Sequence, residues 1–397
     1  MAISTTASAQ YYSTVPQGVR LINTRNIQST IKSSFNHSQI ETPNAFEIDA
    51  GIENLMAIDN EIVQDAISVL APYKKALSAV SLGTHRIEAV ADIDVDVFAF
   101  AYGITDRVTA YIGLPVYDAN VKVKYKTVNR SSNKEVAAIL QSINDDDYAQ
   151  TLGNIIENFY NIDENIIQSA IVNTLGYDEL GDWSAQGIGD TELGIMYNFL
   201  NEDTYGMKWT LGVTLPTGYV DDPDQLQDIG FGDGQADIFF EIGGGYRLNN
   251  KTIINAWTRY TYQAESEKSL RAPISDQVFI NDTKSLYTEK LGNKIKLGLD
   301  TEIAVNDWFI LQPSTTYSYT EQTRYSSNDS DANRRLAANT EASAQTVKLL
   351  AKVSTVKLFN QKKFILPAQI SISQEKMVSG MNTPKVDIFE VSLVMFF

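Results

Sequence analysis

The chain has 397 residues, of which 43% are hydrophobic, and its 49 acidic and 32 basic side chains give a net charge of −17. This acidity excludes a nucleic-acid partner, because phosphate binding needs a clustered excess of Lys and Arg. The sequence has no cysteine and no run of the roughly 18 apolar residues that a membrane helix needs, which excludes disulfides, thiolate metal sites and a helical membrane protein.

The N-terminal part of the chain predicts little regular structure apart from one helix. Residues 10–52 are polar and have no sustained period, as in irregular structure or short paired segments. The apolar residues that follow recur at helical spacing: Leu55, Ile58, Ile62, Ala66, Val69 and Leu70. We therefore expect residues 1–84 to form an N-terminal periplasmic segment that carries an amphipathic helix in one or two parts.

A period of two begins near His85 and predicts a β-strand. Its apolar file is Ile87, Ala89, Ala91, Ile93, Val95 and Val97. The opposite file carries Asp92, Asp94 and Asp96, so the strand has one apolar and one acidic face. A turn at 103–106 and a second apolar file over 108–116 complete a hairpin.

The sequence from 129 to 186 is polar with helical patches, which predicts one long loop that contains helices. Beyond it, alternation resumes and continues to the C-terminus. Eleven strands can be counted directly, and bacterial single-chain barrels have an even number. We therefore predict a closed antiparallel transmembrane β-barrel of about 12 strands, with about 14 as the alternative, over residues 85–397. The missing strand is expected in the first 50 residues or in the long loop.

Two features favour a membrane barrel over a soluble β-sandwich, which alternates in the same way. The connections are short at 201–203 and 249–251 but long at 217–233 and 265–283, as when one rim faces the periplasm and the other the exterior. Aromatic residues gather toward strand ends, where rings sit at the lipid headgroups. The large or charged residues inside the strands are then candidates for a lumen-facing substrate path: Asp92, Asp94, Asp96, Asp237, Glu241, Arg247, Trp257, Arg259, Lys294, Lys296, Asp300, Glu302, Lys348 and Lys352.

The last strand carries the most specific signal in the sequence. Apolar side chains occupy every second position up to the C-terminal carboxylate: Phe389, Val391, Leu393, Met395 and Phe397. This pattern resembles the terminal signal by which the barrel-assembly machinery recognises outer-membrane barrels. It predicts the outer membrane of a Gram-negative bacterium as the location, with membrane lipids and lipopolysaccharide as neighbours.

Several segments resemble the outer-membrane family of long-chain fatty-acid and aromatic-hydrocarbon channels, most closely the branch named for the meta-pathway of phenol degradation. The segments are 102–108, 113–116, 189–194, 211–218 with Leu215-Pro216-Thr217-Gly218, and 232–237. The resemblance implies a monomeric barrel whose lumen is obstructed near its periplasmic side by an N-terminal hatch. It also implies passage of hydrophobic small molecules without an energy source. The segment before His85, with its helix, is then the expected hatch.

Three functions follow from this reading. The first is a passive channel for a small hydrophobic or aromatic permeant, without a cofactor or a bound metal. The second is a structural or adhesive surface barrel that binds a partner through its long acidic loops. The third is a lipid-modifying enzyme, which is disfavoured because only His37 and His85 could serve a Ser–His pair. The acidic runs at 145–147 and 221–224 are expected to be solvated, with Ca²⁺ binding as the alternative.

Overall fold

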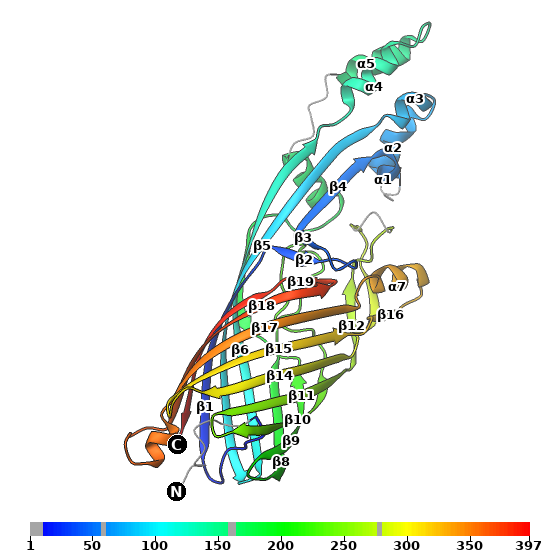
Figure 1. Cartoon of the computed structure of the whole chain (residues 1–397). Coiled ribbons are helices and arrows are strands. Elements are labelled where there is room, and N and C mark those ends of the chain that lie inside the picture. The colour runs from blue at the N-terminus through cyan, green and yellow to red at the C-terminus, as the bar shows by residue number, and fades with distance from the viewer. Residues whose placement is uncertain (1–10, 57–60, 158–163, 276–279) are drawn as a thin grey trace.

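The computed structural model describes residues 11–56, 61–157, 164–275 and 280–397 (Figure 1). Twelve antiparallel strands close into a barrel, which confirms the predicted fold. In the order in which they pair around the wall, they are β1 (Arg20–Ile31), β5 (Ser81–Thr105), β6 (Val108–Asn129), β8 (Thr191–Asn201), β9 (Tyr205–Leu215), β10 (Asp237–Asn249), β11 (Thr252–Gln263), β14 (Lys294–Ala304), β15 (Phe309–Thr320), β17 (Ala342–Ser354), β18 (Ala368–Met381) and β20 (Asp387–Phe396).

The barrel closes between its first and last strands. Leu21 of β1 lies opposite Phe396 of β20, and Arg20 and Phe397 exchange two backbone hydrogen bonds of 2.8 and 3.0 Å. Closure removes both free edges, which a membrane does not tolerate. The strand that could not be counted directly is therefore β1, in the first 50 residues. The predicted boundary at residue 85 is corrected accordingly, because β1 is already part of the barrel wall.

The connections at the two ends of the barrel differ in length. Turns such as 106–107, 202–204 and 250–251 lie at the end that also holds the C-terminus, with α8 (Val356–Asn360) beside them (Figure 1). The long connections lie at the other end. Since outer-membrane barrels keep short turns in the periplasm, the end with the C-terminus faces the periplasm.

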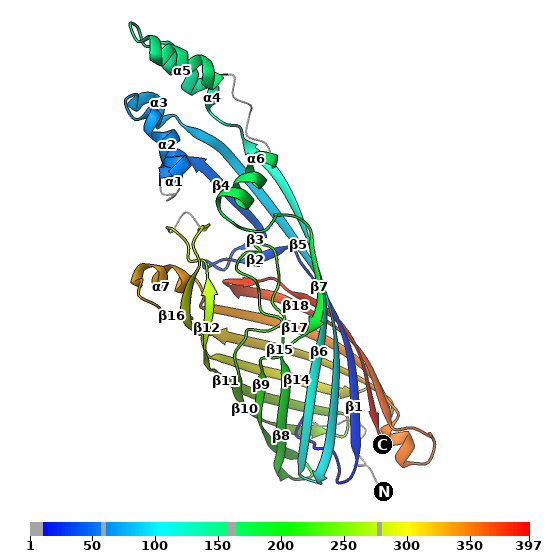
Figure 2. The same cartoon turned by 180° about the vertical axis from the view of Figure 1, so that it is seen from behind.

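The hairpin of β5 and β6 continues well beyond the extracellular rim. Its pairing runs from Thr105–Val108 to Thr84–Asn129, and β4 (Ala45–Gly51) and β7 (Trp183–Ile188) pair along its edges (Figure 2). We call this sheet of β4, β5, β6 and β7 the extension. The predicted long loop contains α4 (Asn133–Gln141), α5 (Asp147–Glu157), α6 (Glu164–Ser169) and the π-helix η1 (Ala170–Thr174).

The amphipathic helix predicted within residues 1–84 forms three helices, α1 (Ile52–Met56), α2 (Glu61–Leu70) and α3 (Lys74–Ser78), at the tip of the extension (Figure 1). This differs from the expected hatch in the lumen. Ala76 packs with Val136, Leu140 and Ala149 in a small core of the tip, and Leu70 packs against it. Ala76 of α3 and Leu70 therefore pack on α4 and α5 rather than in the barrel interior, whereas Val69 is exposed. No helix among the described residues is long and apolar enough to cross a membrane.

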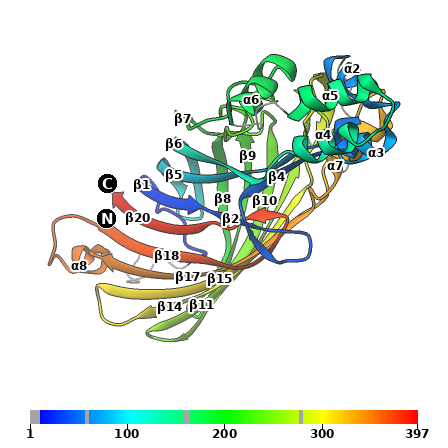
Figure 3. The same cartoon turned by 90° about the horizontal axis from the view of Figure 1, so that it is seen from above.

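Two small sheets complete the extracellular end (Figure 1), and Figure 3 shows the molecule from above. One contains β12 (Glu265–Leu270), β13 (Ser285–Lys290) and β16 (Arg324–Ser326), next to α7 (Ser330–Ala337). The other contains β2 (Ser33–Phe35), β3 (Glu41–Pro43) and β19 (Thr383–Pro384). Through them, loops from distant parts of the sequence are joined above the rim.

The outer face of the wall carries an apolar band. On β5, Phe98, Phe100 and Tyr102 are exposed at alternate positions, and on β20 so are Phe389 and Val391. Such side chains on the outside of a closed barrel face lipid. They also fix which positions of each strand point outward.

Candidate functional site

Most of the predicted lumen residues lie on inward positions of their strands. On β10 the outward Ile238 and Phe240 are exposed, whereas Asp237 and Glu241, at the alternate positions, are buried. The same alternation holds on the neighbouring strands. The predicted residues that it places inward are Asp237, Glu241, Arg247, Trp257, Arg259, Lys294, Lys296, Asp300, Glu302, Lys348 and Lys352.

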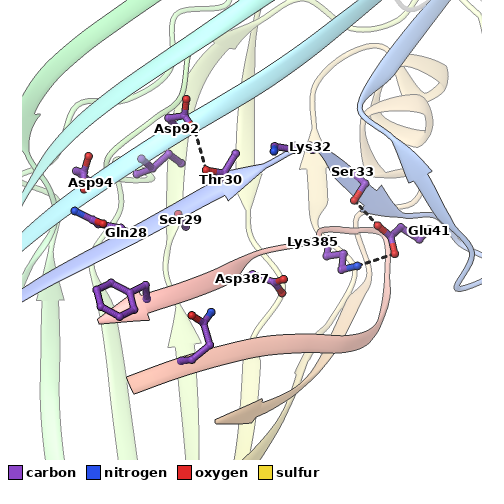
Figure 4. Close-up of a pocket in the computed structure, with 13 residues that line it drawn as sticks. Gln28, Ser29, Thr30, Lys32, Ser33, Glu41, Asp92, Asp94, Lys385 and Asp387 are labelled. Carbon is purple, nitrogen blue, oxygen red and sulfur yellow. Dashed lines mark hydrogen bonds and ion pairs between the residues drawn. The ribbon is translucent and has the colours of Figure 1, made fainter. Parts of the chain in front are cut away.

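Asp92, Asp94 and Asp96 point outward, contrary to the prediction. They share the alternate positions of Phe98 and Phe100 on β5, and their pairing with β1 has no register shift. Asp92 accepts a hydrogen bond from the Thr30 hydroxyl (2.7 Å), as Figure 4 shows. The physical reason is that β5 leaves the membrane: beyond the lipid, its outward face meets water and its apolar face lines the interior.

A charged network around Arg259 lies on the lumen side of β6, β8, β10 and β11. Its Nε donates to Glu241 Oε2 (2.8 Å) and its Nη1 to Glu192 Oε2 (3.1 Å). The Tyr111 hydroxyl donates to the other oxygen of Glu192 (2.6 Å). One guanidinium therefore joins two carboxylates that lie on β8 and β10.

Further inward charges are also paired. Lys348 and Arg25 both bind Glu390, at 2.9 and 2.8 Å, which links β17, β1 and β20. Lys352 lies 3.5 Å from Glu302. These pairs satisfy charges that would be costly to leave alone inside the barrel.

The N-terminal segment 11–18 enters the barrel from the periplasmic end, and we call it the plug. Tyr11 stacks on Trp257, with ring centroids 6.5 Å apart and planes inclined by 12°. The Lys208 ammonium lies 4.3 Å from the centroid of the Tyr11 ring, as in a cation–π contact. The Tyr11 hydroxyl donates to Glu241, so the plug connects directly to the charged network.

Tyr12 is anchored beside it and is 1% exposed. Its carbonyl accepts a hydrogen bond from the Asn198 amide (2.7 Å). A Cβ added to Gly206 or Gly245 would overlap or crowd the Tyr12 ring, so these glycines leave the space that the ring fills. Farther along, the Val15 backbone N–H donates to the Thr109 hydroxyl (2.8 Å). Among the described residues, 11–18 are the part of the chain held at the periplasmic end of the lumen, whereas the expected hatch was the whole segment before His85.

An apolar pocket of about 380 Å³ lies on the inward face of the extension. Side chains of β5 and β6 form its floor, and loops from three connections cover it. The lining residues are Asn44, Ala45, Ile87, Ala89, Val123, Ile171, Leu180, Leu226, Gln227 and Ile280. Ile87, Ala89 and Val123 occupy the inward file that continues the lumen wall.

Arg271 holds these covering loops together and is nearly buried. It donates to Asp224 (2.8 Å), to the carbonyls of Leu175 (3.1 Å) and Gly176 (2.7 Å), and lies over the Tyr177 ring. Lys284 and Arg271 beside Asp224 hold the pKa of that carboxyl below its usual range. The arrangement clasps the connections 130–190, 216–236 and 264–293 above the pocket.

The other predicted sites are placed as follows. The two ring nitrogens of His85 contact the Tyr125 hydroxyl and the Leu82 carbonyl (3.1 Å), and His37 contacts the Asn382 amide. Among the described residues, no group of three or more acidic or histidine side chains has the geometry to hold a metal ion. The C-terminal residues Phe389, Val391, Leu393 and Met395 face outward on β20, and their role as an assembly signal stays a prediction.

Sequence reasoning missed the plug and the pocket. The plug lies in a stretch without any period, and the indirect signal for it was the glycine run 243–245 inside a strand, which marks close approach of another group. Ile87 and Ala89 belong to the predicted apolar face opposite the aspartates that were expected in the lumen, and Val123 lies beyond the apolar set predicted over 108–116.

Comparisons with known proteins agree with this architecture. No family model matches the chain, and no curated protein matches it in sequence. Its structure is similar to that of an outer-membrane channel from Pseudomonas putida F1, with 13% identity, coverage of 98% of each chain and a TM-score of 0.56. Two further structures are more distant. The toluene transporter TbuX of Ralstonia pickettii has 10% identity, coverage of 96% of this chain and 89% of that chain, and a TM-score of 0.34. The monoaromatic hydrocarbon channel CymD has 8% identity, coverage of 96% and 89%, and a TM-score of 0.34. The chain therefore has the fold of an outer-membrane channel, and its location is the outer membrane of a Gram-negative bacterium.

Proposed function

We propose that this protein is a passive outer-membrane channel for small hydrophobic or aromatic molecules. The permeant first occupies the apolar pocket under the loops, then moves along the lumen wall, and leaves past the plug. The inward charged residues from Asp237 to Lys352 line this path.

The observation that carries the proposal is the pocket itself. Exposure of apolar side chains to lipid costs little free energy, whereas their exposure to water is unfavourable. In this protein apolar side chains line the inner side of a sheet that projects beyond the membrane into water. An apolar cavity of about 150 Å³ is enough to hold benzene. A pocket of about 380 Å³ suits a permeant with one or two rings or a short alkyl chain.

The lumen below supports selective rather than free passage. The plug lies at its periplasmic end, and Arg259, Glu192 and Glu241 are paired with one another instead of presenting a uniform charge to an ion. A neutral permeant can pass paired charges without losing a hydration shell of its own. We therefore propose that the plug, rather than a helical hatch, controls exit.

Binding of a homologous series of alkylbenzenes to protein in nanodiscs tests the proposal. Each buried methylene contributes about 0.8 kcal/mol, so each added carbon should tighten binding about fourfold until the pocket is full. Val123→Asp should abolish this dependence. Val128→Asp, on the same strand but exposed, is the matched control and should preserve it. Binding that does not depend on chain length, or that survives in Val123→Asp, would refute the proposed capture site.

A second candidate function is favoured by the tip of the extension. Its helices have their own core around Leu140, and Tyr148 and Ile155 are exposed on α5. An adhesive barrel would use this tip to bind a partner. Deleting residues 133–157 would then abolish adhesion and leave alkylbenzene binding intact, whereas loss of that binding with adhesion unchanged would remove this candidate.

A further inference from the structure

The outward side chains of β6 are apolar at first, then acidic or amide, and then basic. Alternate positions read, from the membrane outward, Ala110, Ile112, Leu114 and Val116, then Asp118 and Asn120, then Lys122, Lys124 and Lys126. The pairing with β5 is free of register shifts over this stretch, so all of them share one face. The three lysines are exposed.

The height of the lysines above the lipid follows from strand geometry. Lys122 is six residues beyond Val116, the last apolar side chain of the column. At about 3.3 Å per residue this is roughly 20 Å along the strand, and a tilt of about 40° reduces it to roughly 15 Å of height. That layer lies outside the acyl chains, where the outer leaflet of a Gram-negative outer membrane presents phosphorylated and carboxylated sugars.

The charge of this layer is opposite to that of the whole chain. Lys32 and Lys122 flank Val90, because β1 ends beside Ala91 and Val90 pairs with Lys122. Among the described residues, Lys32, Lys122 and Lys124 have no carboxylate within 4.0 Å. The acidic side chains nearby are already engaged: Glu88 binds Arg86 (3.2 Å) and Lys126 (3.1 Å), and Glu47 binds Arg86 (3.6 Å). Lysines without partners in a chain of charge −17 point to an anionic ligand.

The wall just below them suits the rest of such a ligand. A cleft of about 660 Å³ lies between the lipid-facing Phe389 and Lys32, and it is also lined by Gln28, Thr30, Lys385 and the carboxylates of Glu41, Asp92, Asp94 and Asp387 (Figure 4). Amide, hydroxyl and carboxylate groups hydrogen-bond sugar hydroxyls. The Asp92 and Asp96 carboxylates are each hydrogen-bonded to β1, by Thr30 and by Asn26.

We infer that the outward face of β1, β5 and β6 binds the anionic sugar core of lipopolysaccharide in the outer leaflet. The acyl chains lie on the apolar band, the first sugars occupy the cleft, and core phosphates and carboxylates pair with Lys122, Lys124 and Lys32. The inference uses the outer face alone and does not depend on what passes through the lumen.

The test compares a double charge reversal, Lys122→Glu with Lys124→Glu, with the same change at Lys362 and Lys363, which are exposed at the periplasmic end. Each variant is placed in nanodiscs, and its binding is measured to lipopolysaccharide with a full core and to lipid A without one. Resistance of the folded barrel to SDS verifies folding of both variants. A surface lysine near an anionic leaflet is worth several-fold in affinity, so the first variant should lose about tenfold or more on the full core.

The variants and ligands for which affinity falls distinguish a specific site from general charge effects. We expect the loss to be confined to the Lys122 and Lys124 variant and to lipopolysaccharide with a core, and to shrink as salt is raised. An equal loss in the Lys362 and Lys363 variant, or an equal loss on lipid A alone, would overturn it, since the lysines would then act only through overall charge or through any anionic lipid. Unchanged binding on the full core would overturn it as well.

Discussion

The hydroxyl of Tyr11 donates a hydrogen bond to Glu241, across 230 positions of sequence. This contact fastens the first described residue of the chain to the middle of the barrel wall, where Glu241 also binds Arg259. The plug and the charged network are therefore one unit, and a change in either should alter passage through the lumen.

Removal of the Tyr11 ring should open the periplasmic end. In Tyr11→Ala the stack on Trp257 and the contact with Lys208 are lost, and we expect single-channel conductance in planar bilayers to rise several-fold. Tyr11→Phe keeps the ring and should show a smaller rise with more frequent openings. Tyr205→Ala, an exposed tyrosine at the same end, is the control. Conductance that is the same in all three variants would mean that the plug does not limit flow.

A side chain added at Gly206 should displace the Tyr12 ring from its site. A Cβ on Gly206 overlaps the Tyr12 ring, so Gly206→Ala should destabilise the barrel by about 1–3 kcal/mol in urea unfolding and raise conductance. Gly113→Ala is the matched control, because a Cβ there meets no atom within 4 Å. If both alanine variants behave alike, packing around Tyr12 is not what holds the plug.

Loss of the Arg259 charge should change ion preference. Arg259→Met leaves Glu192 and Glu241 without their partner, so any aqueous path through the lumen should become more selective for cations. Reversal potentials in a KCl gradient measure this shift, and removal of one partner of a part-buried pair should also cost about 1–3 kcal/mol of stability. Lys251→Met at the periplasmic turn removes the same charge and should do neither. A reversal potential equal to that of the wild type would show that ions do not pass Arg259.

The clasp over the pocket should weaken in acid. Its partners lower the pKa of Asp224 in the folded protein, so the stabilisation is complete above the usual carboxyl range near about 4 and is lost as the pH falls through the lower folded value. Protection factors, which are hydrogen-exchange rates corrected for the intrinsic pH dependence of exchange, should fall at 175–177 and 281 below that range. Asp224→Asn should show low protection factors at every pH. Protection factors that are independent of pH in the wild type would contradict the role given to this pair.

The sequence was sufficient to predict the barrel. It was not sufficient to predict which face of each strand points inward along the whole length of the strand. A period of two identifies a strand, and short and long turns identify its ends. It does not reveal where the strand leaves the lipid, so the acidic file of Asp92 was assigned to the lumen and the apolar file of Ile87 to the opposite face. Asp92 and the lipid-facing Phe98 occupy the same face of β5, so Asp92 points outward and Ile87 points inward.

The N-terminal features were missed for a related reason. In β1 the outward positions include Thr24, Asn26 and Gln28, which are polar, so the strand lacks an apolar file even though it closes the barrel. The plug has no secondary structure and is held by single contacts from Glu241 and Asn198, which lie far away in sequence. Contacts of this kind have no local periodic signal.

Uptake of an aromatic solute by intact cells tests the central claim most directly, because the outer leaflet slows apolar solutes that lack a channel. The initial rate for toluene should be compared with that for a sugar of similar size, in cells that express the wild type, Val123→Asp or Val128→Asp. We predict that the wild type and Val128→Asp speed toluene entry several-fold and the sugar little, and that Val123→Asp loses this advantage. Equal acceleration of toluene by all three proteins, or faster entry of the sugar than of toluene, would contradict a channel that selects hydrophobic molecules through its extracellular pocket.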